Sequence, residues 1–333
     1  MELDGSAAMD GKEIFEKIFS RLSPDVIFYH KLTGIAAFRK YGSKARTVRM
    51  VHDHDLCCPR KHKYFALNGR VCQSRAGWRC WADGAFLNRV NGSIGLVNIG
   101  EKFKEMRDNF ELETLLVGSE FMKEELMQNG FPMQKIRILA PNVKTEDRPF
   151  IPVPEEKNIL FVGQLIRGKG VDLLLRALKK LTCDYATFIV GTGNAEAKLK
   201  KMAEQAGLSG RVHFLGWRDH SEIAKLYLKA RVVAVPSRWP EPFGMIGLEA
   251  MRFGRPVVAF HVGGIPDWLT HEGTGFLVPE QDIDGFAQAL ERLLMNTDLA
   301  QAMGRKGYEH VKSHFSFESY IAQLEQVLEG KAA

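Results

Sequence analysis

The chain has 333 residues and a formal net charge of +6, with 45% hydrophobic and 26% charged residues. This composition is typical of a soluble globular protein, and the length favours two domains over one. No apolar run is long enough to span a bilayer, the first residues are too acidic and polar for a signal peptide, and five cysteines in so long a chain do not indicate a disulfide scaffold. We therefore expect a cytoplasmic protein.

The first half of the chain shows a few clear elements around one long irregular segment. The expected elements are, in chain order, an amphipathic helix at 10–22 and strands at 25–29, 47–51, 115–118 and 136–139. Residues 53–84 have no clear period and hold four of the five cysteines, which indicates a long functional loop. Ser119 is suited to cap a helix that begins at Glu120 and ends before Gly130.

Strands and helices alternate in the second half. The expected strands lie at 159–162, 186–190, 212–215, 232–235 and 257–260, and the expected helices at 171–181, 195–206 and 222–230. This alternation predicts βαβ units and a parallel sheet with helices on both faces. We expect a first domain over 1–145, a proline-rich linker over 146–157, a second domain over 158–315 and a C-terminal helix over 316–333.

Three loops of the second half follow strands directly, at 163–170, 191–193 and 236–244. The carboxyl ends of parallel strands meet at one edge of a sheet, and ligands of such sheets bind there. We therefore expect the three loops to converge on one site.

The stretch from residue 236, PSRWPEPFGMIGLEAM, places Glu241 and Glu249 eight positions apart across a proline-stiffened loop and the start of a helix. Gly244 leaves the main chain open to a ligand, and the amides at a helix start attract anions. The pattern suits a ligand that carries a phosphate and hydroxyls, such as a nucleotide sugar. The alternative is an ordinary strand, loop and helix with two solvated glutamates.

These residues resemble the E-x7-E signature of retaining glycosyltransferases with the GT-B fold, in particular glycosyltransferase family 4. The likeness continues through HVGGIP at 261–266 and GFLVP at 275–279, and upstream through FVGQL at 161–165 and KGVD at 169–172. It covers roughly residues 113–330, and the region before residue 113 matches less well. The resemblance implies two Rossmann-like domains with parallel sheets that face a central cleft, and a retaining transferase that needs no metal or cofactor.

The resemblance also assigns roles to individual residues. Lys169 is the cation for the donor diphosphate, Glu241 contacts the sugar hydroxyls, and His52 lies near the reacting sugar. The residues that the resemblance places around the donor are Gly163, Gln164, Arg167, Trp217, Arg218, Ser237, Phe243, Gly244, Met245 and Glu249, the last of which faces the ribose hydroxyls. The alternatives are a solvated lysine beside a helix for Lys169 and a strand cap for His52.

The chain departs from the family pattern in two places. Gln164 stands where the family usually has an arginine, and Arg167 is placed to compensate for the missing charge. The family also begins with a strand and a glycine-rich loop over the donor phosphates, whereas this sequence begins with an acidic helix. We therefore expect a shortened first domain, with three alternatives: an active short version, a phosphate lid from another subunit, or binding without transfer.

Residues 31–79 hold twelve Lys or Arg against Asp53 and Asp55 alone. Such a segment suits an anionic membrane surface or a phosphorylated glycolipid acceptor, while the alternative is a solvated basic face. We expect no nucleic-acid partner, because no nucleic-acid-binding motif accompanies the charge. Cys58, Cys72 and Cys80 offer a weaker alternative, a zinc site, but they lack a paired C-x-x-C knuckle, and buried or free thiols are favoured.

The sequence thus predicts transfer of a hexose-type sugar from a nucleotide diphosphate sugar to a glycan, a lipid-linked glycan or a lipopolysaccharide-type acceptor, with peripheral membrane contact. One rival function is a non-catalytic partner subunit that binds a nucleotide sugar. A second rival is an epimerase or phosphorylase that shares the fold.

Overall fold

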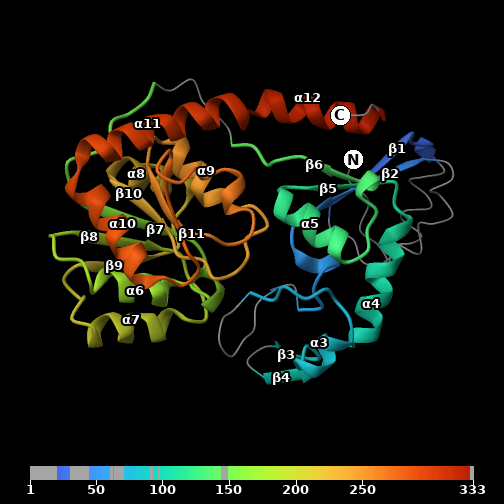
Figure 1. Ribbon diagram of the computed structural model, residues 1–333, viewed down its shortest axis with the longest axis horizontal. Helices are drawn as coiled ribbons and strands as arrows, with labels where there is room; N and C mark the ends of the chain where they lie inside the picture. The colour runs from blue at the N-terminus through green and yellow to red at the C-terminus, as the bar shows by residue number, and fades with distance from the viewer. Residues whose placement is uncertain are drawn as a thin grey trace. The chain divides into compact units, whose positions relative to one another are not determined.

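The computed structural model describes residues 21–30, 45–60, 63, 71–90, 93–96, 98–143 and 149–330. The chain divides into two compact units (Figure 1): the first is Met1–Lys61, Arg75–Val117 and Glu125–Arg137, and the second is His62–Ser74, Gly118–Glu124 and Ile138–Ala333. Each unit is built on its own sheet of parallel strands, which confirms the predicted α/β class with two parallel sheets. The predicted domain limits at 145, 157 and 315 stay predictions. Most of the helix expected at 10–22 lies outside the described residues.

The sheet of the first unit has the strand order β1-β2-β5-β6. Its strands are β1 (Val26–Tyr29), β2 (Arg46–Val51), β5 (Thr114–Val117) and β6 (Ile136–Ile138). β2 pairs in parallel with both β1 and β5, and the side chains of β2 and β5 are almost all buried. All four strands coincide with runs that the sequence predicts.

The loop expected at 53–84 is partly helical in its described residues. In the described part of the first 143 residues, the short helices are η2 (His54–Leu56), α3 (Trp78–Ala82), α4 (Ile99–Asp108), η3 (Asn109–Glu111), α5 (Glu120–Gln128) and η4 (Met133–Lys135). The predicted cap of α5 is confirmed, because the Met122 amide donates to Ser119 Oγ at 3.1 Å. The hairpin of β3 (Leu87–Val90) and β4 (Ser93–Leu96) was not predicted, although the sequence places Asn91-Gly92, a pair that favours two-residue hairpin turns, between the two strands.

The second unit contains a six-stranded sheet in the order β12-β11-β10-β7-β8-β9, with parallel pairing throughout. Its strands are β7 (Asn158–Val162), β8 (Ala186–Val190), β9 (Val212–Gly216), β10 (Val232–Val235), β11 (Val257–Phe260) and β12 (Gly275–Val278). The chain starts at β7, winds outward to β9, and then crosses back to β10 on the other side of β7. The winding direction therefore reverses between the neighbouring strands β7 and β10. Parallel sheets of this kind bind their ligands at the carboxyl ends of the strands beside such a reversal.

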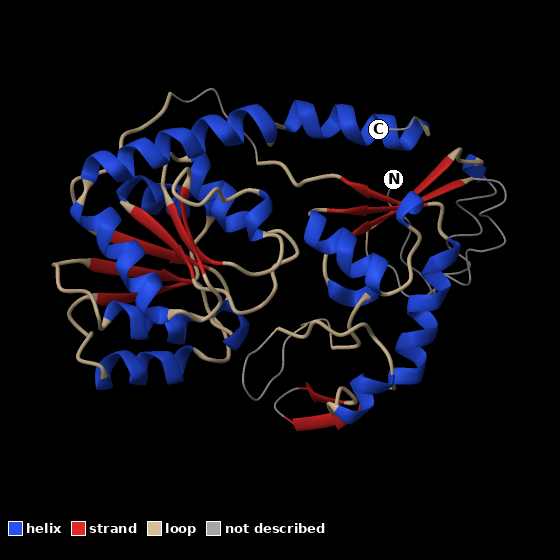
Figure 2. Cartoon of the chain, in the orientation of Figure 1, coloured by secondary structure: helices blue, strands red, loops and turns tan. Residues whose placement is uncertain are grey.

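Helices cover both faces of this sheet (Figure 2). The described helices that follow β7 in the chain are η5 (Arg167–Lys169), α6 (Val171–Leu178), α7 (Glu196–Gln205), α8 (His220–Lys229), α9 (Met245–Arg252), η6 (Ile265–Asp267), α10 (Ile283–Met295), α11 (Thr297–His314) and α12 (Phe317–Glu329). α10 packs beside α6 and α6 beside α7, while α11 packs beside α9. Because both faces are covered, β10 and β11 are fully buried and consist of apolar residues alone.

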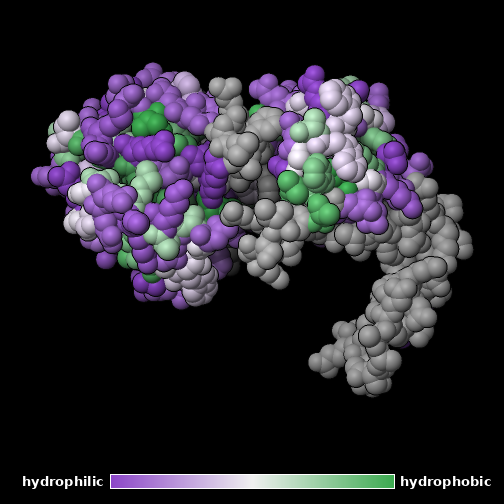
Figure 3. All heavy atoms as spheres, turned by 90° about the horizontal axis from the view of Figure 1, so that it is seen from below, coloured by the Kyte–Doolittle hydropathy of each residue, from purple (hydrophilic) through white to green (hydrophobic). Residues whose placement is uncertain are grey.

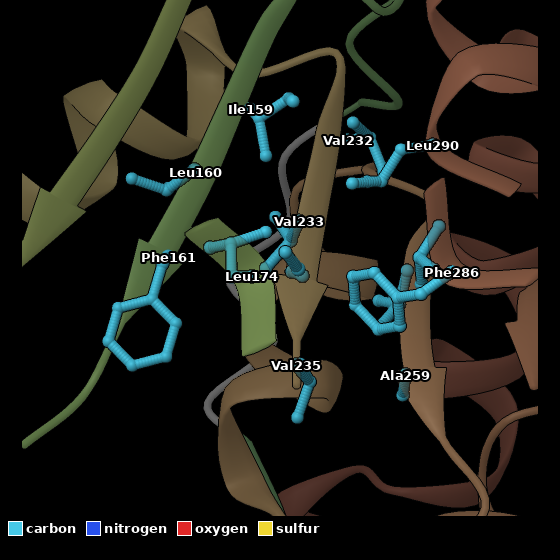
Figure 4. Close-up of a cluster of buried hydrophobic side chains, with 14 of the residues drawn as sticks. Ile159, Leu160, Phe161, Leu174, Val232, Val233, Val235, Ala259, Phe286 and Leu290 are labelled. Atoms are coloured by element: carbon cyan, nitrogen blue, oxygen red, sulfur yellow. The ribbon is translucent and has the colours of Figure 1, made fainter. Parts of the chain in front are cut away.

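One part of the core of the second unit lies between the sheet and α6 and α10 (Figure 4), and the same core includes buried residues of α9 and α11. Leu174 of α6 and Phe286 of α10 are fully buried there, beside strand residues such as Ile159 and Val233. In the view of Figure 3, hydrophilic side chains cover most of the described surface of the second unit. Among the described residues, no helix is both long enough and apolar enough to cross a membrane.

Candidate active site at the edge of the second sheet

The loops that follow β7 and β10 touch at the carboxyl edge of the sheet. Gly170 has φ +70°, and a Cβ built on it would lie 1.8 Å from the carbonyl oxygen of Pro236, so only glycine permits this approach. On the other side of the loop after β7, a Cβ on Gly191 would lie 2.0 Å from the Gly163 carbonyl, and the Leu165 amide donates to the Thr192 carbonyl at 2.9 Å. The predicted convergence of the three loops is confirmed.

A lysine and a glutamate from these two loops form an ion pair at this edge. Lys169 Nζ lies 2.7 Å from Glu241 Oε1, and Ser237 Oγ donates to the same oxygen at 2.6 Å. Glu241 is only 7% exposed at its side chain, while Lys169 is 20% exposed and lies 5.0 Å from the centre of the Trp239 ring. The structure thus brings together three residues that the sequence predicted for the site.

The second carboxylate, Glu249, lies on α9 and contacts a different helix. The hydroxyl of Tyr227, on α8, donates to Glu249 Oε2 at 3.1 Å, and Tyr227 is almost fully buried. Burial raises the pKa of the Glu249 carboxyl, and the Tyr227 hydroxyl, His220 and Arg252 each act to lower it. Burial, followed by the charge of Glu249, raises the pKa of Tyr227 well above its ordinary value, so this tyrosine keeps its proton and remains a donor.

The start of α9 is held by a tryptophan that the sequence did not single out. Gly244 precedes the helix with φ +96° and gives it no side-chain cap, so the first amides of α9 are not satisfied in that way. The indole Nε1 of Trp268 donates to the Phe243 carbonyl at 2.6 Å, and its ring fills the space that a side chain at Gly247 would need. Met245 begins the helix, as expected.

The remaining predicted donor residues lie nearer the surface. Gln164 and Arg167 are exposed on the loop after β7. Trp217 is 70% exposed, and Arg218 Nη1 donates to the Trp217 carbonyl at 3.0 Å. Within the described part of the chain, no hydrogen bond or ion pair joins Trp217 or Arg218 to Lys169 or Glu241. The Gly191 amide donates to the Gly216 carbonyl at 2.8 Å and so links that strand end to the loop at 191–193.

His52 belongs to the first unit, where it follows β2 with its side chain exposed. Its Nε2 lies 2.9 Å from Nδ1 of His30, which follows β1, and the two rings stack with centres 5.2 Å apart. Sequence analysis missed His30, although its position directly after a buried strand is the same signal that marked His52. Arg49, on β2, is buried and ion-pairs with Asp55 at 2.5 Å.

The described residues contain no group of three or more His, Cys, Asp or Glu side chains that could hold a metal ion. The zinc alternative at Cys58, Cys72 and Cys80 stays an untested prediction, because neighbouring residues such as 61–62 and 64–70 lie outside the described part of the chain. The sulfur of Cys72 lies 4.0 Å from the carbonyl oxygen of Ser74.

The sequence profile of the family described as "Glycosyl transferases group 1" matches residues 143–310, half of the chain, and the chain belongs to this family. A D-inositol 3-phosphate glycosyltransferase of Corynebacterium jeikeium is 29% identical over 250 residues, which cover 72% of this chain and 58% of that protein. The lipopolysaccharide core biosynthesis glycosyltransferase LpsE of Rhizobium meliloti is 32% identical over 187 residues, which cover 56% of this chain and 54% of that protein. The chain spans about half the length of the curated relatives it matches.

Solved structures share the fold at lower identity. The sucrose-phosphate synthase of Thermosynechococcus elongatus superposes with a TM-score of 0.75 at 23% identity, over 96% of this chain and 76% of that chain. The Anabaena protein HepE, solved with UDP and glucose, superposes with a TM-score of 0.74 at 16% identity, over 96% of this chain and 81% of that chain. These likenesses establish the two-domain glycosyltransferase fold, GT-B.

Proposed function

We propose that the chain is a retaining glycosyltransferase of family 4, which moves a hexose-type sugar from a nucleotide diphosphate sugar to a glycan, glycolipid or lipopolysaccharide-type acceptor. The observation that carries the proposal is the cluster of Lys169, Ser237 and Glu241 at the carboxyl ends of β7 and β10. It lies where the strand order of the second sheet reverses, which is the position that favours a nucleotide ligand.

The chemistry of the cluster suits a donor with a diphosphate and sugar hydroxyls. An ammonium group has three N–H donors, and Lys169 uses one of them on Glu241, so two are left for phosphate oxygens. Both contacts of the Glu241 carboxylate given above fall on Oε1, and Oε2 is the oxygen to which a sugar hydroxyl would donate. The amides at the start of α9 add positive polarity beside them.

In the proposed reaction the acceptor oxygen forms a bond to the anomeric carbon while the bond from that carbon to the diphosphate breaks. The acceptor hydroxyl loses its proton to a phosphate oxygen of the leaving group, on the same face, which retains the configuration. Lys169 and the amides of α9 stabilise the charge that develops on the diphosphate, and Glu241 holds the sugar. Neither glutamate attacks carbon, and the proposal includes no metal.

The acceptor side of the proposal rests on the first unit and on the names of two relatives, a lipopolysaccharide core transferase and a phosphatidylinositol monomannoside mannosyltransferase. Trp78 and Trp81 of α3 are 75% and 50% exposed, and the guanidinium of Arg79 lies 5.8 Å from the Trp78 ring centre. Exposed indoles beside arginine suit an anionic membrane surface.

Co-sedimentation with vesicles that contain phosphatidylglycerol tests this contact. The Trp78→Ala/Trp81→Ala variant should bind the vesicles more weakly than wild type, and equal binding would contradict the contact.

Turnover by matched variants tests the proposed activity. Purified chain would be incubated with UDP-, GDP- and ADP-sugars and a panel of glycan and glycolipid acceptors, with nucleotide release and product anomer as readouts. Glu241→Ala should lower the rate roughly 100-fold or more, since it removes a group that orients the sugar. Glu196→Ala, which breaks an exposed ion pair with Lys200 in the same unit, should not. Equal rates for Glu241→Ala and wild type, or an inverted anomer, would contradict the proposal.

The rival reading, a non-catalytic subunit, makes a different prediction in the same experiment. Wild type would then bind a nucleotide by calorimetry and release none of it from a nucleotide sugar with any acceptor. An epimerase would instead convert the donor with no acceptor present.

A further inference from the structure

We propose that Arg238 is a positioning residue: its guanidinium holds the turn that carries Lys169 against the loop that carries Glu241, and so sets the geometry of the donor site. The inference rests on the proposed function of that site. Arg238 comes two residues before the proline that precedes Glu241, and the sequence analysis gave it no role.

The guanidinium reaches three oxygens on the other loop and its helix. Nη1 and Nη2 donate to Oδ1 and Oδ2 of Asp172 at 2.8 and 2.9 Å, as a two-pronged pair, and Nη1 also donates to the Arg167 carbonyl at 2.8 Å. Asp172 lies in the first turn of α6, and Arg167 begins the short helix η5 that ends at Lys169. The Arg238 guanidinium therefore contacts the chain on both sides of Lys169, at Arg167 and at Asp172.

The backbone of the same loop makes a second set of contacts. The amides of Arg238 and Trp239 both donate to the Gly168 carbonyl, at 2.9 and 3.0 Å. Gly168 directly precedes Lys169, and the close approach of Gly170 to the Pro236 carbonyl fixes the residue after it. The side chain of Lys169 lies within these contacts, with its Nζ 5.0 Å from the centre of the Trp239 ring and 2.7 Å from Glu241 Oε1.

Stability alone is a poor explanation for this ion pair. The side chain of Arg238 is 5% exposed and that of Asp172 is 28% exposed, so forming the pair costs desolvation that apolar side chains of similar size would avoid. What a planar, two-pronged contact supplies is a fixed orientation, because two parallel N–H···O bonds allow little rotation. A lysine keeps the charge at this position but cannot make both bonds.

The test compares Arg238→Lys with a matched arginine elsewhere in the unit. Arg231 is also buried, but its guanidinium donates to the carbonyl oxygens of Pro154 and Leu294 and to Thr297, away from the lysine loop. Both variants would be titrated with UDP by calorimetry, with GDP and ADP in parallel. We expect nucleotide binding about tenfold weaker for Arg238→Lys, which lies within the range of couplings in one hydrogen-bonded network, and unchanged for Arg231→Lys. Asp172→Asn should act like Arg238→Lys.

A double-mutant cycle separates positioning from a general structural effect. If Arg238 acts through the lysine, Arg238→Lys should cause little further loss of affinity once Lys169→Ala is present. Full additivity in the cycle, or wild-type affinity in Arg238→Lys, would overturn the inference.

Hydrogen exchange gives a readout that needs no ligand: the amides of Arg238 and Trp239 should exchange faster in Arg238→Lys than in Arg231→Lys. Equal exchange would overturn the positioning role, whereas failure of all three nucleotides to bind wild type would overturn the proposed function as well.

Discussion

At the scale of single residues, the buried hydrogen bond between Tyr227 and Glu249 links the donor site to pH. Burial raises the pKa of Glu249, and the tyrosine hydroxyl opposes this shift, as do His220 and Arg252. Tyr227→Phe removes one lowering interaction, so the pKa of Glu249 should rise further. If Glu249 must be ionised to accept from ribose hydroxyls, the pH below which nucleotide binding weakens should move upward in Tyr227→Phe.

The control for this prediction is Tyr185→Phe. Tyr185 is also buried, and its hydroxyl donates to the Leu178 carbonyl at 2.9 Å rather than to a site carboxylate. Calorimetric titrations with a nucleotide between about pH 4 and 8 should show the upward shift in Tyr227→Phe alone. If nucleotide binding weakened below the same pH in both variants, the role given to the Tyr227 hydroxyl would be contradicted.

The raised pKa of Glu249 also predicts a dependence of stability on pH. A carboxyl group whose pKa is higher in the folded than in the unfolded state stabilises the fold when protonated. The stabilisation from Glu249 is complete below the pKa of about 4.3 that a glutamate has in the unfolded chain. It is lost as the pH rises through the higher pKa of Glu249 in the folded protein. The free energy of unfolding of wild type, relative to Glu249→Gln, should therefore fall over that window in urea titrations. A constant difference across it would contradict the assignment.

Sequence reasoning located the main site residues but not their partners. Lys169, Ser237 and Glu241 followed from motifs in loops at strand ends, and the structure joins them. The pairings of Arg238 with Asp172 and of Tyr227 with Glu249 cross 66 and 22 positions of the chain, and no local pattern encodes them. The signal that could have pointed to a partner is an arginine between two prolines, directly after an apolar strand, because a charge in such a buried position is rarely left unpaired.

At the scale of elements, helix α9 depends on one glycine. A Cβ on Gly247 would lie 1.8 Å from Cη2 of Trp268, whose indole is tied to the Phe243 carbonyl just before the helix. Gly247→Ala should therefore displace the ring or the helix start and destabilise the fold by about 1–3 kcal/mol, as overpacking does. It should also weaken nucleotide binding, although the added methyl group touches no ligand.

Gly210→Ala is the matched control, because a Cβ there would meet nothing within 4 Å. Urea denaturation should give a lower midpoint for Gly247→Ala and an unchanged one for Gly210→Ala. If Gly247→Ala kept the stability and nucleotide affinity of wild type, the Trp268 contact would not position α9.

The strands and helices of the second unit were more predictable than those of the first. A parallel sheet buried on both faces leaves long apolar runs in strands such as β10 and β11, and amphipathic helices separate them. In the first unit, β3 and β4 are short and α4 carries many charged residues, so periodicity gives a weak signal. Segments such as 31–44 and 64–70, which hold several of the predicted basic residues, lie outside the described residues.

At the scale of the whole molecule, the predicted active-site residues other than His52 lie in the second unit, which also holds the family match at 143–310. We therefore propose that the second unit recognises the nucleotide and that the first unit binds the acceptor. Variants of Lys169 or Glu241 should weaken the binding of a nucleotide sugar, whereas His52→Ala should slow transfer and leave nucleotide affinity nearly unchanged. Loss of nucleotide binding in His52→Ala would contradict this division.

The central claim is that the edge formed by β7, β10 and α9 binds a nucleotide sugar. Thermal unfolding of the full chain with UDP, GDP and ADP, and with their common sugars, tests it most directly. A ligand that binds only the folded state at 100 times its Kd adds about 2.7 kcal/mol of stability, so one nucleotide family should raise Tm by several degrees. The same ligand should raise Tm much less in Lys169→Ala. No shift with any nucleotide, or an equal shift in wild type and Lys169→Ala, would contradict the claim.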